Sequence, residues 1–123
     1  EFVISNNIPL FGVCRGMQLI QDYFGGKLTS VKGHTATRHR LSVNPDSRYE
    51  QRLNSFEDVN AYHGLGAFDS VDELRVSARS EDNVIMAVEH TSLPIFGQMW
   101  HPERETLISL QQVALLKHAM TSL

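Results

Sequence analysis

The stretch Ile8-Pro9-Leu10-Phe11-Gly12-Val13-Cys14-Arg15-Gly16-Met17-Gln18 contains the features that decide the fold. Residues 8–13 form a short apolar run of the kind found in buried strands. After Cys14, apolar residues recur at three- and four-residue spacings as far as Gly25-Gly26. This pattern predicts a helix of about ten residues that ends at the two glycines. A strand, a tight turn and a helix in this order indicate an α/β fold.

Cys14 stands at the predicted turn, between Gly12 and Gly16. A sharp strand-to-helix turn strains its central residue, and glycines two positions away remove β-carbons that would collide. The side chain then projects above the sheet, and the N–H of Arg15 can face a developing oxyanion. The start of a helix behind the cysteine favours a thiolate. A lone cysteine is usually a buried, inert side chain, so it is the glycines and the strand–helix context that favour a nucleophile.

The remainder of the chain predicts further strands and a C-terminal helix. We expect short strands at 27–31 and 40–43, a hairpin at 74–78 and 84–88, a strand at 95–100 and a helix from 105 onward. A central strand such as 8–13 needs neighbours on both sides, and parallel neighbours need crossover connections for which too few residues precede it. We therefore expect that N-terminal βα units are missing from this chain and that residues 1–123 form the C-terminal portion of a single domain. A complete small domain is the alternative.

His101-Pro102-Glu103 follows the strand predicted at 95–100. If that strand runs parallel to residues 8–13, its C-terminal end lies at the same sheet edge as Cys14, where catalytic groups gather in open α/β folds. A cysteine nucleophile needs a base, and the base needs a group that orients it. His101 is the candidate base and Glu103 the candidate orienting group. Taken alone, His101 would be interpreted as a surface histidine and Glu103 as a carboxylate at a helix start. The combination of Cys14 with His101 is what favours a catalytic role.

Composition bears on the class of function. The 123 residues are 41% hydrophobic and 20% charged, with a formal net charge of −3, so there is no electrostatic basis for binding nucleic acid or an anionic membrane. The single cysteine suits a reducing compartment, and we expect a cytoplasmic protein. No apolar run reaches the roughly 18 to 20 residues of a membrane span. Because there is one cysteine and no compact histidine–carboxylate cluster, no metal site is expected, and no cofactor.

Together these residues resemble the class I (triad-type) glutamine amidotransferase superfamily. The stretch from Pro9 to Gln18 is similar to its nucleophile segment, and Trp100-His101-Pro102-Glu103 is similar to its His-x-Glu segment. The resemblance implies a flavodoxin-like α/β sheet with flanking helices. It also implies that Cys14 attacks the γ-carbonyl of a glutamine-type amide, with His101 as base and acid and Glu103 as its orienting group.

The resemblance implies further site residues. The backbone N–H of Arg15 is one oxyanion donor, whereas the second comes from a glycine-rich loop ahead of the nucleophile strand, which residues 1–123 lack. Gln18 matches the position that helps to hold the glutamyl group. Asn60-Ala61-Tyr62-His63-Gly64 resembles the segment that contacts the substrate's α-amino and α-carboxylate groups, so Tyr62 and His63 are substrate-binding candidates. A strand end followed by a loop is the alternative for that segment.

Within the superfamily, Cys14-Arg15-Gly16 and residues 60–63 look more like the γ-glutamyl hydrolase (peptidase C26-like) branch. This implies hydrolysis of γ-glutamyl amides through a γ-glutamyl thioester, with glutamate and an amine as products. Residues 100–105 resemble hydrolases of γ-glutamyl conjugates in bacterial sugar-nucleotide and capsule pathways, with γ-glutamyl-CDP-amidate as the first candidate substrate. The alternatives are a glutaminase subunit that supplies ammonia to a synthase partner, and a non-catalytic regulatory module of the same fold.

A basic stretch contains Lys32, His34, Arg38, His39 and Arg40 without an acidic residue among them. A phosphate-bearing leaving group would be attracted to such a loop. A solvated loop or edge strand protected by its charges is the simpler interpretation, and we favour it.

Overall fold

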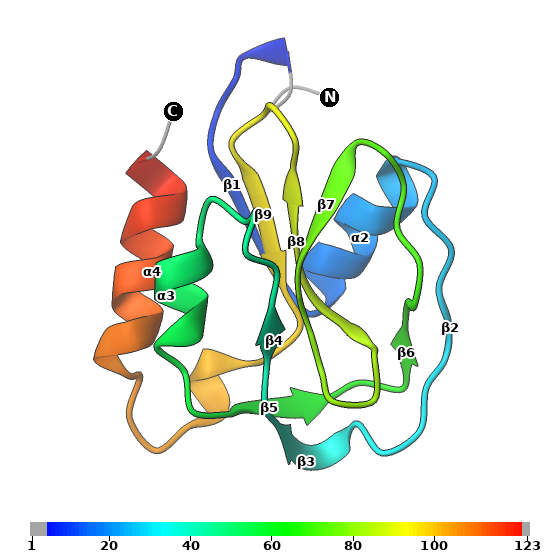
Figure 1. The fold of residues 1–123 in the computed structure, drawn as a ribbon, viewed down its shortest axis with the longest axis vertical. Coiled ribbons are helices and arrows are strands. Elements are labelled where there is room, and N and C mark those ends of the chain that lie inside the picture. The colour runs from blue at the N-terminus through cyan, green and yellow to red at the C-terminus, as the bar shows by residue number, and fades with distance from the viewer. Residues whose placement is uncertain (1–4, 122–123) are drawn as a thin grey trace.

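The computed structural model describes residues 5–121 and has an α/β fold (Figure 1). In chain order the elements are β1 (Leu10–Val13), α2 (Arg15–Tyr23), β2 (Thr29–Ser30), β3 (Thr35–His39), β4 (Ser42–Val43), α3 (Glu50–Asn54), β5 (Val59–Tyr62), β6 (Leu65–Gly66), β7 (Leu74–Arg79), β8 (Ile85–His90), β9 (Ile95–Gln98), the 3-10 turn η1 (Pro102–Arg104) and α4 (Leu110–Thr121). None of the helices within 5–121 has the length and apolar character needed to cross a membrane.

The main sheet has the strand order β1-β9-β8-β7-β4. Strands β1 and β9 run parallel, in register from Leu10 opposite Ile95 to Val13 opposite Gln98. The other pairs are antiparallel, and β7 and β8 form the hairpin that the alternating sequence predicted. Within residues 5–121, β1 lies at the end of the sheet, so the strand that was expected to have two neighbours has one.

Helix α2 packs closely on the β1–β9 pair because both strands carry a glycine at the contact. A β-carbon on Gly12 would lie 2.7 Å from the carbonyl carbon of Gly16, and one on Gly97 would lie 2.8 Å from Met17 Cγ. Nine residues of helix therefore rest almost directly on the backbone of two strands. This close packing fixes the position of the residue that joins β1 to α2.

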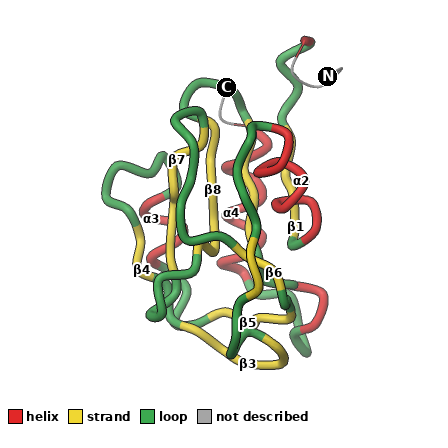
Figure 2. Tube along the Cα trace, turned by 90° about the vertical axis from the view of Figure 1, so that its right-hand side faces the viewer, coloured by secondary structure: helices red, strands yellow, loops and turns green. Residues whose placement is uncertain are grey.

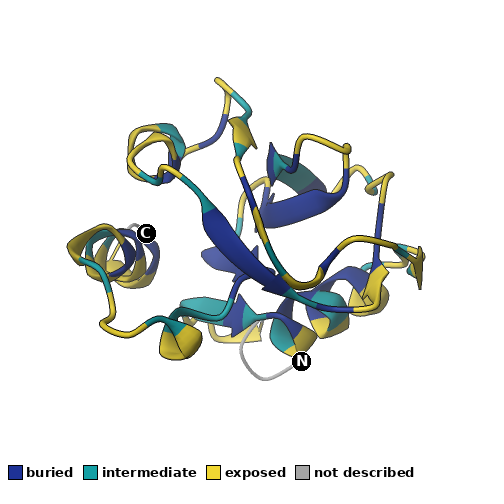
Figure 3. Ribbon diagram, turned by 90° about the horizontal axis from the view of Figure 1, so that it is seen from below, coloured by how far each residue is buried: buried dark blue, intermediate teal, exposed yellow. Residues whose placement is uncertain are grey.

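The opposite face of the sheet is covered by α3 and α4. Phe96 in β9 packs against Phe11 in β1, with ring centroids 5.3 Å apart, and against Tyr49 just ahead of α3, at 4.8 Å. The Tyr49 ring also contacts His118 of α4 at 4.9 Å. The sheet between the helical layers is largely buried, as the dark strands in Figure 3 show.

Two short ladders lie beyond the main sheet. Strand β3 pairs with β5, and β2 pairs with β6, both antiparallel. The β3–β5 ladder crosses the end of the molecule at which β1 and β9 terminate (Figures 1 and 2). The strands expected at 27–31 and 40–43 are reduced to the two-residue strands β2 and β4. Strand β3 was not predicted, whereas β5 agrees with the alternative of a strand end followed by a loop at residues 60–64.

The C-terminal helix differs from its prediction in both its start and its buried face. It begins at Leu110, after η1 and an irregular segment, rather than at 105. Its buried residues are Gln112, Leu115 and Ala119. The apolar residues that predicted the helix are exposed instead: Leu107, Leu110, Val113, Leu116 and Met120. Figure 3 shows this exposed outer surface on the helix nearest the C-terminus.

Candidate active site

Cys14 joins β1 to α2 with φ 52° and ψ −99°, a backbone conformation that residues other than glycine rarely adopt. Its N–H donates to the Gln98 carbonyl at the end of β9 (2.7 Å), and its carbonyl accepts from the N–H of Gln18 (3.0 Å). The predicted strained turn is therefore present. The predicted crowding is present at Gly12, but a β-carbon on Gly16 would meet nothing within 4 Å.

The thiol of Cys14 is buried, with 8% of the residue exposed. Burial raises the pKa of Cys14, whereas the N–H of Arg15, which faces the sulfur, and the charge of Arg15 lower it. Glu103 raises this pKa and Arg104 lowers it to a smaller extent, and the pKa ends above its ordinary value. The predicted preference for thiolate at the helix start is thus outweighed by burial. The resting group is a thiol, and a base must remove its proton before it can attack.

His101 and Glu103 are joined by a hydrogen bond of 2.6 Å between Nδ1 and Oε2. Because an ionised carboxylate only accepts, Nδ1 carries the proton, and Nε2 of a neutral ring is left with a lone pair. Partial burial raises the pKa of Glu103, but its backbone hydrogen bond and the bond from His101 outweigh this effect and leave the pKa below its ordinary value. Glu103 is therefore ionised at neutral pH and can stabilise an imidazolium.

The two halves of the site follow neighbouring parallel strands. Cys14 comes directly after β1, and His101 comes shortly after β9. Both therefore lie at the carboxyl edge of the parallel pair, as the sequence predicted. In Figure 1 this is the lower end of the sheet, where β1 leads into α2.

Asn60 in β5 holds the backbone of His101 from both sides. Its Nδ2 donates to the His101 carbonyl and its Oδ1 accepts from the His101 N–H, both at 2.8 Å. The same Nδ2 lies 3.0 Å from Oε2 of Glu105. Asn60 is 3% exposed, and its segment was predicted to be either a substrate contact or a strand end followed by a loop, with no role for Asn60 beneath His101. A buried amide between apolar neighbours was the one available signal, since its partner is 41 residues away.

Tyr62 flanks the candidate base. Its ring meets that of His101 edge-on, with centroids 6.2 Å apart and an interplanar angle of 76°. The guanidinium of Arg104 lies over the Tyr62 ring, 4.3 Å from its centroid. The structure thus brings Tyr62 to the site beside His101, and adds Arg104, which the sequence did not single out.

Gln18 and His63 meet at one backbone carbonyl. Gln18 Nε2 donates to the carbonyl of Leu65 at 3.2 Å, and His63 Nδ1 contacts the same oxygen at 2.9 Å. The other ring nitrogen of His63 lies 3.1 Å from Nδ1 of His34. With both nitrogens occupied and 5% of the residue exposed, the His63 ring is turned into the protein and offers no group to a substrate.

The basic stretch is paired with carboxylates. Arg38 lies 2.6 Å from Asp58 and 2.9 Å from Glu105. His34 and His39 are buried rather than solvated and contact Asp82 and Glu81. The favoured interpretation, a solvated loop or edge strand, fits the exposed Lys32, Arg38 and Arg40 but not the buried His34 and His39.

The expectation of no compact histidine–carboxylate cluster was wrong. Potential ligand atoms of His34, His39 and Asp82 lie within 4.8 Å of one another. The rings of His34 and His39 are stacked, however, with centroids 4.0 Å apart and planes 9° from parallel. An imidazole binds a metal through a lone pair in the ring plane, and no nearby point lies in both planes. This arrangement of the rings does not fit a metal ion.

Comparison with known proteins agrees with the class that the fold and the site geometry indicate. A solved structure from Thermoplasma acidophilum, described as that of a GMP synthase subunit, matches 97% of this chain and 59% of its own, with a TM-score of 0.76 and 20% identity. The fold is therefore that of the α/β glutamine amidotransferases. The peptidase C26 family matches residues 1–103, and the chain belongs to this family of class I glutamine amidotransferases.

Two curated relatives differ in what their names say they do. Anthranilate synthase component 2 of Thermococcus kodakarensis is 37% identical over 84% of this chain and 54% of its own length. The γ-glutamyl-CDP-amidate hydrolase of Campylobacter jejuni is 31% identical over 95% of this chain and 52% of its own. The chain thus spans about half the length of these relatives.

Proposed function

We propose that the protein hydrolyses γ-glutamyl amides, with Cys14 as nucleophile, His101 as base and acid, and Glu103 as the group that orients His101. The observation that carries this proposal is the 2.6 Å bond from His101 to Glu103 at the same sheet edge as a cysteine held at φ 52°. Membership of a family of glutamine amide hydrolases supports it. A module without chemistry would need neither the strained cysteine nor the oriented histidine.

The first half of the reaction transfers the acyl group to sulfur. His101 Nε2 takes the thiol proton, and Sγ of Cys14 attacks the γ-carbonyl carbon of the substrate. The N–H of Arg15 faces the sulfur and donates to the oxyanion that forms. The imidazolium, stabilised by Glu103, then returns the proton to the leaving nitrogen. The C–N bond breaks, the amine or ammonia departs, and a γ-glutamyl thioester remains on Cys14.

The second half releases the acid. His101 removes a proton from water, and the hydroxyl oxygen attacks the thioester carbon. The C–S bond breaks, glutamate leaves, and the sulfur regains its proton from His101. We propose that the second oxyanion donor comes from a glycine-rich loop in N-terminal βα units that precede residues 1–123, which would make this chain the C-terminal portion of the catalytic domain.

For the amine half of the substrate, we favour a conjugate over free glutamine. The support for this choice is the Campylobacter jejuni relative, which makes γ-glutamyl-CDP-amidate the first substrate to test. A glutaminase subunit of a synthase is the second candidate, favoured by the likeness to anthranilate synthase component 2.

The test uses the full-length protein, assayed alone on glutamine and on γ-glutamyl amides with different leaving groups. We expect a conjugate to be turned over efficiently and glutamine poorly, with loss of turnover in Cys14→Ala. A glutamine-like diazoketone should label Cys14, as peptide mass spectrometry would show. Strong glutaminase activity that requires a second protein would favour the synthase subunit instead. If the folded protein shows neither turnover nor labelling, both the hydrolase and the glutaminase subunit are rejected, and the regulatory module is favoured.

A further inference from the structure

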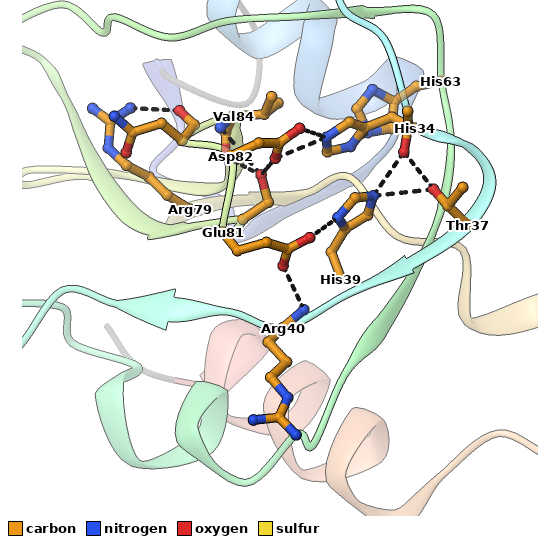
Figure 4. Close-up of polar contacts among 12 residues, drawn as sticks. His34, Thr37, His39, Arg40, His63, Arg79, Glu81, Asp82 and Val84 are labelled. Atoms are coloured by element: carbon orange, nitrogen blue, oxygen red, sulfur yellow. Dashed lines mark hydrogen bonds and ion pairs between the residues drawn. The ribbon is translucent and has the colours of Figure 1, made fainter.

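Three buried histidines and two acidic residues meet beside the candidate active site (Figure 4). His34 lies between His63 and Asp82: its Nδ1 is 3.1 Å from His63 Nε2, and its Nε2 is 2.9 Å from Asp82 Oδ2. The far nitrogen of His63 contacts the Leu65 carbonyl at 2.9 Å. These contacts form a continuous chain from the Asp82 carboxylate to the Leu65 carbonyl, which we call the histidine chain.

Counting protons along the histidine chain gives its charge. Both ends, the Asp82 carboxylate and the Leu65 carbonyl, can only accept hydrogen bonds. The three contacts between them therefore need three protons. Two neutral imidazoles carry two, so one further proton must be bound for every contact to be a hydrogen bond. A chain with two protons would oppose two lone pairs in a buried site, which is costly.

The surroundings indicate where the additional proton lies. Burial lowers the pKa of His63 to about 4, although its bond to Leu65 acts in the opposite direction, so His63 is the neutral ring. Partial burial raises the pKa of Asp82, but its bonds with Ser80 and His34 outweigh this and leave the pKa below its ordinary value, so Asp82 is ionised. His34 is then the imidazolium, which donates to Asp82 on one side and to His63 on the other.

The charge on His34 is balanced by its neighbours. The ring of His39 stacks on that of His34 at 4.0 Å, and His39 is itself paired with Glu81. On the other ring nitrogen, His39 contacts the Gly33 carbonyl and Thr37 Oγ1, each at 3.0 Å. The carboxylates of Asp82 and Glu81 thus accompany the two stacked rings, and Asp82 offsets the charge of a positive His34.

The histidine chain ends at a carbonyl that also serves the nucleophile helix. Leu65 accepts from His63 on one side and from Gln18 of α2 on the other. Gln18 lies one helical turn after Cys14, whose carbonyl accepts from its N–H at 3.0 Å. We propose that His34, as an imidazolium between Asp82 and His63, is a positioning residue that fixes the Leu65 carbonyl and through it the Gln18 side chain of the glutamyl subsite. This inference rests on the proposed function, because it assigns Gln18 to the acyl half of the substrate.

Loss of the proton on His34 should loosen the glutamyl subsite. The chain would then hold two protons, and one contact, either at Asp82 or at Leu65, would lose its hydrogen bond. Gln18 would be held by a less fixed carbonyl, while His101 and Glu103 would be unchanged. The apparent affinity for the acyl half should therefore fall as pH rises, with a much smaller effect on the chemical step.

Two substitutions distinguish an effect of the number of protons in the histidine chain from an effect of altered side-chain packing. In Asp82→Asn the side-chain amide can donate to His34, which supplies the third proton and lets both histidines stay neutral. In His34→Gln an amide N–H that faces Asp82 leaves the amide oxygen towards His63, so a neutral His63 has one proton for two acceptors and the chain lacks a proton between pH 6 and 9. His90→Gln is the matched control, because His90 is buried at the opposite end of β8, where its Nδ1 accepts from the N–H groups of Ser92 and Leu93 and lies 3.4 Å from Ser92 Oγ.

The experiment measures KM and kcat of the full-length protein from pH 6 to 9, and the Kd of L-glutamate over the same range by calorimetry. At pH 6 we expect His34→Gln to raise KM and Kd about ten-fold, the factor that one lost hydrogen bond gives, with kcat changed less than about two-fold. Both constants should rise with pH in the wild type and stay level in Asp82→Asn. Wild-type constants in His34→Gln at pH 6, or a wild-type pH dependence in Asp82→Asn, would overturn the inference.

The glutamate measurement keeps this inference separate from the proposed function. Glutamate binding that responds to the substitutions, in a protein that hydrolyses no amide, would reject the hydrolase and retain the positioning role of His34. If His34→Gln does not fold, the histidine N–H groups of the ¹⁵N-labelled wild type decide the question by NMR. Protons on both nitrogens of His34 and on Nδ1 of His63 at pH 6 support the inference, and a bare nitrogen on His34 contradicts it.

Discussion

Glu103 acts on the candidate base through one short bond, and that bond decides which nitrogen of His101 carries the proton. In Glu103→Gln the amide can donate to Nδ1, which would put the proton on Nε2 and remove the lone pair that accepts the thiol proton. We expect kcat of the full-length protein to fall about a hundred-fold or more, with little change in KM. Glu73→Gln, an exposed residue next to β7 at the opposite end of the sheet, is the control. A kcat within two-fold of the wild type would exclude the orienting role.

His63 should make the stability of the fold depend on pH. Burial lowers its pKa from 6.5 to about 4, so the unfolded chain binds this proton first as pH falls. The free energy of unfolding should therefore decrease between pH 6.5 and 4, by about 3 kcal/mol from this residue when the loss is complete. Urea unfolding across that range should show a smaller decrease in His63→Gln. Parallel curves for the two proteins would contradict the assignment of His63 as the neutral ring.

At the scale of elements, the turn at Cys14 depends on unequal roles of its two glycines. A β-carbon on Gly12 would lie 2.7 Å from Gly16 backbone and 2.9 Å from Ile20 Cδ1, whereas one on Gly16 would meet nothing within 4 Å. We expect Gly12→Ala to push α2 from the sheet, lower the free energy of unfolding by about 1–3 kcal/mol and reduce turnover. Gly16→Ala should leave stability unchanged or raise it by up to about 1 kcal/mol, because alanine favours a helix. The free energy of unfolding of both variants is measured by thermal unfolding. An equal decrease in Gly12→Ala and Gly16→Ala would contradict the unequal roles of the two glycines.

Elements that a local pattern specifies were predicted well, and those made by distant partners were not. The β7–β8 hairpin, β9, and α2 with its glycine stop follow from alternation and helical spacing. Strand β3 is polar and exposed along most of its length, so no alternation marks it, and its pairing with β5 is what makes it a strand. His34 and His39 were read as members of a basic loop because Asp82 and Glu81, which bury and pair them, lie 48 and 42 residues away.

The candidate site could be predicted as far as the chain order of strands determines it. Once β1 and β9 are taken as parallel neighbours, Cys14 and His101 must lie at one edge, and Glu103 is two residues from His101. Asn60 could not be found in this way, because it reaches His101 from the small β3–β5 ladder rather than from the main sheet. His63 lies in the segment predicted to contact substrate, but the direction of its ring depends on its contact with His34, 29 residues away.

At the scale of the whole molecule, one side of β1 is left without a partner among residues 5–121. The N–H groups of Leu10 and Cys14 donate towards β9, so the alternation of a parallel strand turns those of Phe11 and Val13 to the other side. Helix α4 packs against β1, and its exposed apolar residues, such as Leu110 at 85%, add to the uncovered surface. Since this chain covers about half the length of its relatives, we expect a further strand of the full-length protein to pair with β1.

Amide hydrogen exchange of the full-length protein tests this expectation. If a strand pairs with the outer side of β1, Phe11 and Val13 should exchange within about ten-fold of Leu10, whose N–H is bonded to the Pro94 carbonyl. Strand β4 supplies an internal reference, because it ends the sheet on the other side and its outward amides should exchange quickly. Exchange of Phe11 and Val13 at the fast rate of those amides would show that β1 remains an edge, and the second oxyanion donor would then have to reach Cys14 without a strand beside β1.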